Sequence, residues 1–122
     1  MVDAPSRQLQ TLKAEFFRAL AHPIRIRLLE VLATTSECSV QELQHILGLD
    51  QPIVSQQLAR LRASGIVVAT KTGTATRYAV TDPLMKDLLA VAKRILNRRL
   101  VDAQQLLQEL EQDTAPHGPR KK

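Results

Sequence analysis

The order of four short segments in the middle of the chain restricts its fold most strongly. Residues 40–47 (VQELQHIL) and 52–64 (PIVSQQLARLRAS) repeat apolar residues at helical spacing, and only the short turn GLDQ separates them. The β-branched runs IVVAT and TRYAV follow, joined by KTGTA, in which Gly73 suits a hairpin turn. Two helices, a tight turn and a hairpin in this order predict a helix-turn-helix followed by a β wing.

Helical patterns also precede this central block. His22 and Pro23 separate a first helix from a second one with the sequence IRIRLLEVLAT, because proline is well placed at the first position of a helix. Ser39 is expected to cap the helix at 40–47, and Glu42 completes a capping box. The side chains expected to face inward from the second helix are Leu28, Leu29 and Leu32.

Residues 83–112 predict one long helix with an apolar stripe along its whole length. A small domain cannot easily cover such a stripe, whereas a helix from a second copy can, and the first helix offers another apolar surface. We therefore expect a homodimer built from the first and last helices. Its predicted interface residues are Leu9, Leu12, Phe16, Leu88, Ala92, Ile95, Leu96 and Ala103.

The expected fold is mainly α with a small β-hairpin, a winged helix-turn-helix. With 122 residues, of which 44% are hydrophobic and 2% aromatic, the chain suits one domain with an aliphatic core. We expect a flexible lead-in at 1–8, a DNA-binding and dimerisation domain at 9–112, and a disordered basic tail at 113–122.

The polar residues of the second helix of this motif, together with the wing, predict contact with double-stranded DNA. A helix fits the major groove, where amide and hydroxyl side chains bind base edges, and a basic wing lies along the phosphates. The formal charge of +5 agrees with such a surface. The candidate DNA contacts are Ser39, Gln51, Ser55, Gln56, Gln57, Arg60, Lys71, Thr74 and Arg77.

The segments FFRALAHPIRIRLLEVL, SVQELQHILGLDQPIVSQQLARLRASGIV and GTATRYAV closely resemble the ArsR/SmtB family of bacterial winged-helix repressors. The resemblance covers residues 9–100 and holds the three segments in register. It implies a dimer that binds an imperfect palindrome and is released by a metal ion or another chemical signal. Repression is the family default, since an activator would bind DNA in the same way.

The cysteine and aspartate positions that hold metals in this family are mostly occupied by other residues here. The paired cysteines of arsenic and cadmium sensors correspond to Ser39 and Gln41, and Cys38 beside them is a single thiol. The ligand positions of zinc sensors correspond to Asp82, Leu84, Ile95 and Arg98. Only the aspartate of that set is present, so the resemblance carries over neither site.

Histidines offer another metal hypothesis. His45 is interpreted as a structural residue of its helix, and no histidine pair has the spacing of a helical chelate. His22 and His117 meet across a dimer if the tail folds back, as chain ends do in nickel sensors of the family. No cofactor is required, and a regulatory transition metal such as nickel or zinc is one hypothesis for the effector.

The remaining patterns exclude or favour whole classes of protein. Without a glycine-rich phosphate loop, a nucleophile elbow or an acid-base cluster, the sequence indicates no enzyme. The single cysteine and the polar first residues favour a reduced, cytoplasmic protein with no membrane contact. Two alternatives stay open: a dimeric protein-interaction module, and a regulator that needs a protein co-regulator in place of its own effector site.

Overall fold

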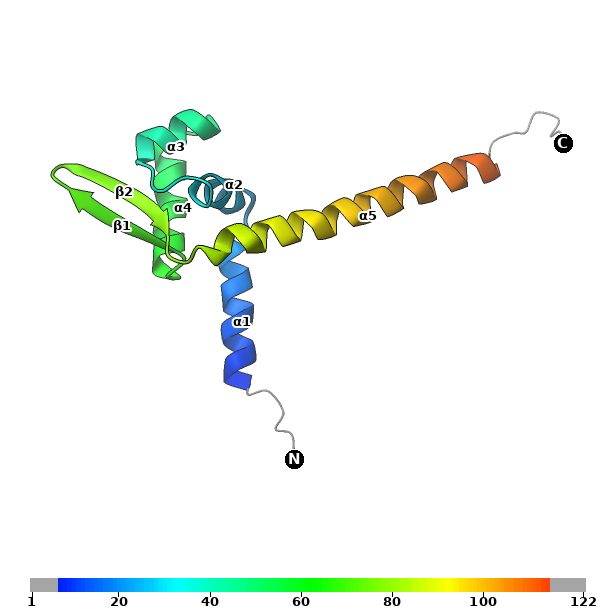
Figure 1. Cartoon of the computed structure of the whole chain (residues 1–122), viewed down its shortest axis with the longest axis horizontal. Helices are drawn as coiled ribbons and strands as arrows, with labels where there is room; N and C mark the ends of the chain where they lie inside the picture. The colour runs from blue at the N-terminus through cyan, green and yellow to red at the C-terminus, as the bar shows by residue number, and fades with distance from the viewer. Residues whose placement is uncertain (1–6, 115–122) are drawn as a thin grey trace. The chain divides into compact units, whose positions relative to one another are not determined.

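The computed structural model describes residues 7–114 and has the predicted mainly helical architecture with one hairpin (Figure 1). The chain divides into two units, 1–86 and 87–122, and each is described by itself. We call residues 7–86 the winged unit and residues 87–114 the C-terminal unit. The elements are α1 (Arg7–Leu20), α2 (Pro23–Leu32), α3 (Val40–Leu47), α4 (Gln51–Ala63), β1 (Val67–Thr72), β2 (Ala75–Val80) and α5 (Leu84–Thr114).

The ends of the helices differ slightly from the sequence predictions. Residues 7 and 8 belong to α1, although they fall within the lead-in expected at 1–8. Residues 113 and 114 belong to α5, although they fall within the tail expected at 113–122. The rest of both segments lies outside the described residues. The division between the two units falls within α5, after Lys86, and so lies inside the domain expected at 9–112.

The core of the winged unit lies where α2, α3 and α4 pack together. The three leucines predicted to face inward from α2 are fully buried, which confirms the periodicity argument for that helix. Aliphatic side chains of α3 and α4 meet them, and no large ring is needed to fill the space. The largest fully buried side chains are Leu28, Leu29, Leu32, Leu43, Val54, Leu58 and Leu61.

Local capping explains why the short helices begin and end where they do. The Nδ1 atom of His22 accepts a hydrogen bond from the Ile24 N–H (3.1 Å), and Pro23 occupies the first turn of α2. At the other end of the next helix, Gly48 adopts a left-handed conformation (φ 66°) and closes α3. These caps separate α3 from α4 by only three residues.

The hairpin pairs β1 with β2 in an antiparallel register, Val67 opposite Val80 and Thr72 opposite Ala75. Gly73 turns the chain with a positive φ of 65°, as its position between the two runs predicted. Ile66 and Val67 are buried at the base of the wing, while its tip is exposed. The base therefore anchors the wing to the core.

The C-terminal unit consists of the greater part of α5. From residue 90 to residue 113 every side chain is exposed, including a series of leucines, isoleucine and valines. Helices of this length often raise the question of membrane insertion. Among residues 7–114, however, no helix combines the length and the apolar character that a membrane span requires.

Leu43→Ala tests whether α3 is held by its buried face. Leu43 is completely buried, and removing its side chain leaves a cavity that lowers the free energy of unfolding by about 2–5 kcal/mol. The matched control is Ile46→Ala on the same helix, where the side chain is exposed and the expected loss is small. Urea denaturation followed by circular dichroism measures both, and equal losses would contradict the packing described.

Candidate nucleic-acid interface

A pocket of about 470 Å³ forms where the beginnings of α3 and α4 face the wing. It brings together four of the nine predicted DNA contacts, from three separate segments of the chain. The Nε2 atom of Gln51 donates a hydrogen bond to Ser55 Oγ (2.8 Å), so the first turn of α4 presents an ordered amide and hydroxyl pair. The four predicted residues that line this pocket are Ser39, Gln51, Ser55 and Thr74.

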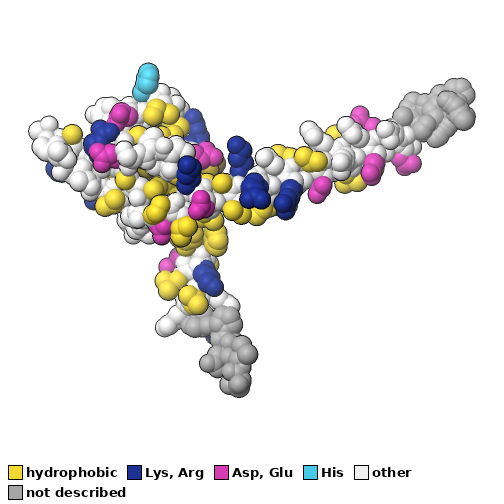
Figure 2. All heavy atoms as spheres, viewed as in Figure 1, with side chains coloured by type: hydrophobic (Ala, Val, Ile, Leu, Met, Phe, Trp, Pro, Cys, Tyr) yellow, Lys and Arg dark blue, Asp and Glu magenta, His cyan; other side chains and the backbone are white. Residues whose placement is uncertain are grey.

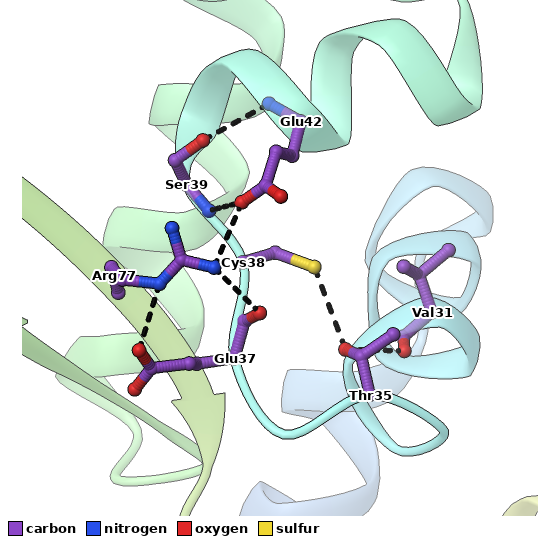
Figure 3. Close-up of polar contacts among 7 residues, drawn as sticks. All are labelled: Val31, Thr35, Glu37, Cys38, Ser39, Glu42 and Arg77. Carbon is purple, nitrogen blue, oxygen red and sulfur yellow. Dashed lines mark hydrogen bonds and ion pairs between the residues drawn. The ribbon is translucent and has the colours of Figure 1, made fainter.

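Arg77 on β2 ties the wing to the segment that precedes α3 (Figure 3). Its Nε lies 2.7 Å from Glu37 Oε1, and its Nη2 lies 3.0 Å from Glu42 Oε1. The same Nη2 donates a hydrogen bond to the Glu37 carbonyl oxygen (3.2 Å). One guanidinium thus binds two carboxylates and a backbone oxygen, which is the fixed fork geometry that arginine provides.

The backbone repeats this connection. The Cys38 N–H donates to the Tyr78 carbonyl (2.9 Å), and the Tyr78 N–H donates to the Cys38 carbonyl (2.7 Å), so Cys38 forms an antiparallel bridge with β2. The Cys38 side chain is buried, with Sγ 3.5 Å from Thr35 Oγ1 (Figure 3). We call the Cys38–Tyr78 bridge and the Arg77 ion pairs together the wing clamp.

Glu42 belongs both to the wing clamp and to the cap of α3. The Ser39 N–H donates to Glu42 Oε1 (2.9 Å), and the Glu42 N–H donates to Ser39 Oγ (3.1 Å), which confirms the predicted capping box. The Ser39 backbone hydrogen bond, and then the nearby charge of Arg77, lower the pKa of Glu42 below its ordinary 4.5. A lowered pKa stabilises the fold above pH 4.5, and this contribution is lost as the pH falls through the lowered value.

Gln57 does not lie where we predicted. It was expected on the exposed side of α4, but only 8% of it is exposed and its Oε1 has no hydrogen-bond partner in the structure. The spacing contained the signal, since Val54, Gln57, Leu58 and Leu61 stand at i, i+3, i+4 and i+7 of one helical face. A buried amide on the core face has no route to a base edge, so Gln57 leaves the candidate surface.

Arg77 and Arg60 are predicted DNA contacts that lie outside the pocket between α3, α4 and the wing. The guanidinium of Arg77 is held by the wing clamp. Arg60 is exposed but lines a different pocket, in the company of Arg18 and Arg25. Gln56 on α4 and Lys71 on β1 are exposed, as a contact surface requires. Glu37 was missed, because no sequence pattern links residues 40 positions apart.

The candidate metal ligands do not form a site in the part of the chain that the structure describes. His22 Nδ1 is occupied as the cap of α2, and His117 lies outside the described residues. Asp82 Oδ1 accepts a hydrogen bond from the Leu84 N–H (2.8 Å) and so has a capping role. Between residues 7 and 114, no three histidine, cysteine, aspartate or glutamate side chains gather closely enough to hold a metal ion.

Arg77→Gln tests the wing clamp. Removing the guanidinium is expected to raise the Glu42 pKa while leaving it below 4.5, because the stronger effect of the Ser39 N–H persists. Amide exchange at Cys38 and Tyr78 is expected to accelerate, since the bridge loses its side-chain support. Carboxyl-detected NMR titration and hydrogen exchange measure the two effects. Arg62→Gln is the control, and a Glu42 pKa equal in both variants contradicts the clamp.

Known proteins with similar sequences and structures identify the family. The sequence model for bacterial regulatory proteins of the arsR family matches residues 22–68. The chain is 43% identical over 105 residues to the uncharacterised HTH-type transcriptional regulator Rv0081 of Mycobacterium tuberculosis, covering 86% of this chain and 92% of that protein. It is 40% identical over 80 residues to a probable mercury resistance operon repressor of Streptomyces lividans, covering 66% and 63%.

Solved structures agree with this assignment. The crystal structure of Rv0081 superposes with a TM-score of 0.71 at 46% identity, covering 80% of this chain and 98% of that one. The antimony-specific repressor AntR superposes with a TM-score of 0.70 at 26% identity, covering 80% and 88%. These proteins are transcriptional regulators and not enzymes. The chain therefore belongs to the ArsR family and is a winged helix-turn-helix, DNA-binding transcriptional regulator.

Proposed function

We propose that the protein is a cytoplasmic repressor that binds a palindromic operator as a homodimer, with α4 in the major groove and the wing on the adjacent backbone. The observation that carries this proposal is the pocket in which the first turns of α3 and α4 meet the wing. A helix N-terminus and a hairpin tip on one surface offer a base-reading element and a phosphate-binding element side by side.

Each exposed polar residue has a role in this proposal. Gln51, Ser55 and Gln56 face base edges from the first two turns of α4, where amide and hydroxyl groups discriminate bases. Ser39 at the start of α3 and the wing tip bind phosphates, the tip through Lys71 and Thr74. Arg77 acts indirectly, because the wing clamp sets the distance between wing and recognition helix. Gln57 and Arg60 take no part.

The proposed dimer rests on apolar side chains that the single chain leaves uncovered. In α1, Leu12 is 61% exposed, and in α5, Ile95 and Leu96 are more than half exposed. Exposed apolar surface of this extent marks an interaction site. A two-fold dimer places two α4 helices on two half-sites, which matches a palindrome. The proposed interface residues remain Leu9, Leu12, Phe16, Leu88, Ala92, Ile95, Leu96 and Ala103.

The effector is proposed only as a class. One relative is named as a probable mercury resistance operon repressor, and one solved structure is named as an antimony-specific repressor. Residues 7–114 of this chain, however, do not fit a resident metal site. No step of the proposed function therefore passes through a metal. A small-molecule ligand or a protein co-regulator that changes the dimer is sufficient to release the operator.

Gln56→Ala tests base reading by α4. If Gln56 binds a base edge, its removal is expected to reduce discrimination against the wrong base by about 1–3 kcal/mol at one position of each half-site. Fluorescence anisotropy with the duplex upstream of the protein's own gene, and with variant and scrambled duplexes, measures the change. Gln108→Ala in α5 is the matched control and keeps full discrimination.

Lys71→Ala tests the wing separately. Loss of a phosphate contact is expected to weaken binding to every duplex alike and to reduce the slope of log K against log salt by about one per lysine. Titrations at several salt concentrations give this slope, and Lys13→Ala in α1 serves as the control. Equal affinity of the unaltered protein for upstream and scrambled duplexes would contradict the proposed function and favour a protein-interaction module.

A further inference from the structure

A second pocket of the winged unit lies at the opposite end of α4 from the candidate DNA interface. It has a volume of about 380 Å³ and forms where the ends of α1 and α4 meet the start of α2. Pockets that bind small molecules span about 300–1,000 Å³, so the space is sufficient for a small ligand. The pocket is lined by Glu15, Arg18, Ala19, Arg25, Arg60 and Ser64.

Positive charge is in excess in this pocket. Basic and acidic side chains are interspersed on the face of the winged unit that Figure 2 shows. In the pocket, by contrast, three guanidinium groups meet a single carboxylate, which leaves a formal charge of +2. Within residues 7–114 the ion pairs belong to Arg77, so Glu15 does not pair with any arginine of the pocket. We call Arg18, Arg25 and Arg60 the arginine cluster, and an anion between them relieves their mutual repulsion.

Arg25 is the member of the arginine cluster that its own helix does not explain. Arg18 and Arg60 stand in the last turns of α1 and α4, where a positive side chain complements the negative end of the helix dipole. Arg25 stands in the first turn of α2, at the positive end, and that turn contains no acidic residue. Its Nε atom is buried and has no hydrogen-bond partner. A buried donor is normally paired, so the start of α2 favours an acceptor that carries negative charge.

A neutral acceptor from the protein does not answer the same need. The other buried side-chain atom without a partner in the described chain is Gln57 Oε1, on the helix that packs against α2. An amide oxygen can accept one hydrogen bond from Arg25, but it carries no charge and leaves the formal +2 of the pocket unbalanced. The excess charge therefore points to a ligand.

We infer that this pocket binds a small dianionic oxyanion, the chemistry that a phosphate monoester and a dicarboxylate share. Their oxygens match the guanidinium fork, which donates two parallel hydrogen bonds to them. A charge of −2 balances the pocket. Arg25 is only partly buried, so a turn of its side chain brings Nε and one Nη to the same ligand. The lining has no aromatic ring and only one apolar side chain, Ala19, which suits a ligand without a large apolar group.

The pocket is placed to connect its ligand with the operator. α4 contributes Arg60 at its end, and its first turn faces DNA in the proposed function. The rise along α4 from Gln51 to Arg60 is only about 14 Å at 1.5 Å per residue. An anion that binds Arg18 and Arg60 together fixes α1, part of the proposed dimer surface, against the recognition helix. Ligand binding itself is independent of the proposed function, and only its effect on the operator rests on it.

Anion titration of the full-length protein tests the site. NMR titration with inorganic phosphate, glycerol 3-phosphate and succinate at constant ionic strength gives the dissociation constants and follows the Arg25 Nε–H signal directly. Arg18→Gln and Arg60→Gln are each expected to raise the dissociation constant about ten-fold, because each removes a charged donor. Arg62→Gln, in the same turn of α4 but outside the pocket lining, is the control. No saturable binding of any of the three anions, or equal weakening by Arg62→Gln, would overturn the inference.

Glu15→Gln provides a test that damage to the fold cannot imitate. Removing the one carboxylate of the pocket is expected to lower the dissociation constant about two- to five-fold, because a repelling charge is lost. Glu30→Gln, at an exposed position of α2 outside the pocket, keeps the constant unchanged. Tighter binding of the two phosphates than of succinate assigns a phosphate ester, and the reverse order assigns a dicarboxylate. Unchanged or weaker binding by Glu15→Gln contradicts the site.

DNA titrations on the same samples separate the ligand site from the DNA surface. If the arginine cluster binds DNA phosphates instead, Arg18→Gln and Arg60→Gln each reduce the salt slope of binding to the upstream duplex by about one, and the inference fails. A small-anion site predicts an unchanged slope and an affinity for this duplex that saturating anion changes about five-fold or more. Equal affinity with and without the anion contradicts the link to the operator. A protein that binds the anion but does not distinguish upstream from scrambled duplexes contradicts the proposed function and leaves the anion site intact.

Discussion

The wing clamp is the interaction on which the candidate interface depends. Without the wing clamp, the hairpin loses both its backbone hydrogen bonds and its ion pairs to the segment before α3, and an isolated two-stranded hairpin is marginally stable in water. The bridge joins the segment before α3 to β2 through two backbone hydrogen bonds. Because α3 begins two residues after Cys38, the wing clamp holds the wing beside the start of the helix-turn-helix.

The clamp is a network, and its value lies in position more than in strength. Exposed ion pairs contribute little each, and about half of the Glu42 side chain is exposed, so its pairing with Arg77 adds little to the overall stability. The same carboxylate, however, caps α3 through Ser39 and holds the guanidinium of the wing. One side chain thus couples the start of a helix to a strand that lies 35 residues later. Several contacts fix the positions of Glu42 and Arg77, although each contact contributes little to the free energy of folding.

The sequence predicted the fold well because most of it is set locally. Helical spacing, the proline at the start of α2, the capping box and the glycine of the hairpin act within a few residues, and each was found where expected. Contacts between distant parts of the chain are not set by local patterns. The contact between Arg77 and Glu37 spans 40 residues, so no local pattern predicts it, whereas the spacing of Gln57 does place that residue on the core face of α4.

The C-terminal unit shows why a single chain is an incomplete description of this regulator. A helix gains most of its stability from packing an apolar face, and every side chain of α5 from residue 90 to residue 113 is exposed in the single chain. The proposed homodimer offers that segment a surface to pack against. If a second copy covers the apolar face of α5, then folding of α5, dimerisation and operator binding are thermodynamically coupled. All three then depend on protein concentration. A ligand that changes the pairing of α5 then changes operator occupancy without touching α4, because two half-sites bound by a dimer gain affinity that two separate chains lack.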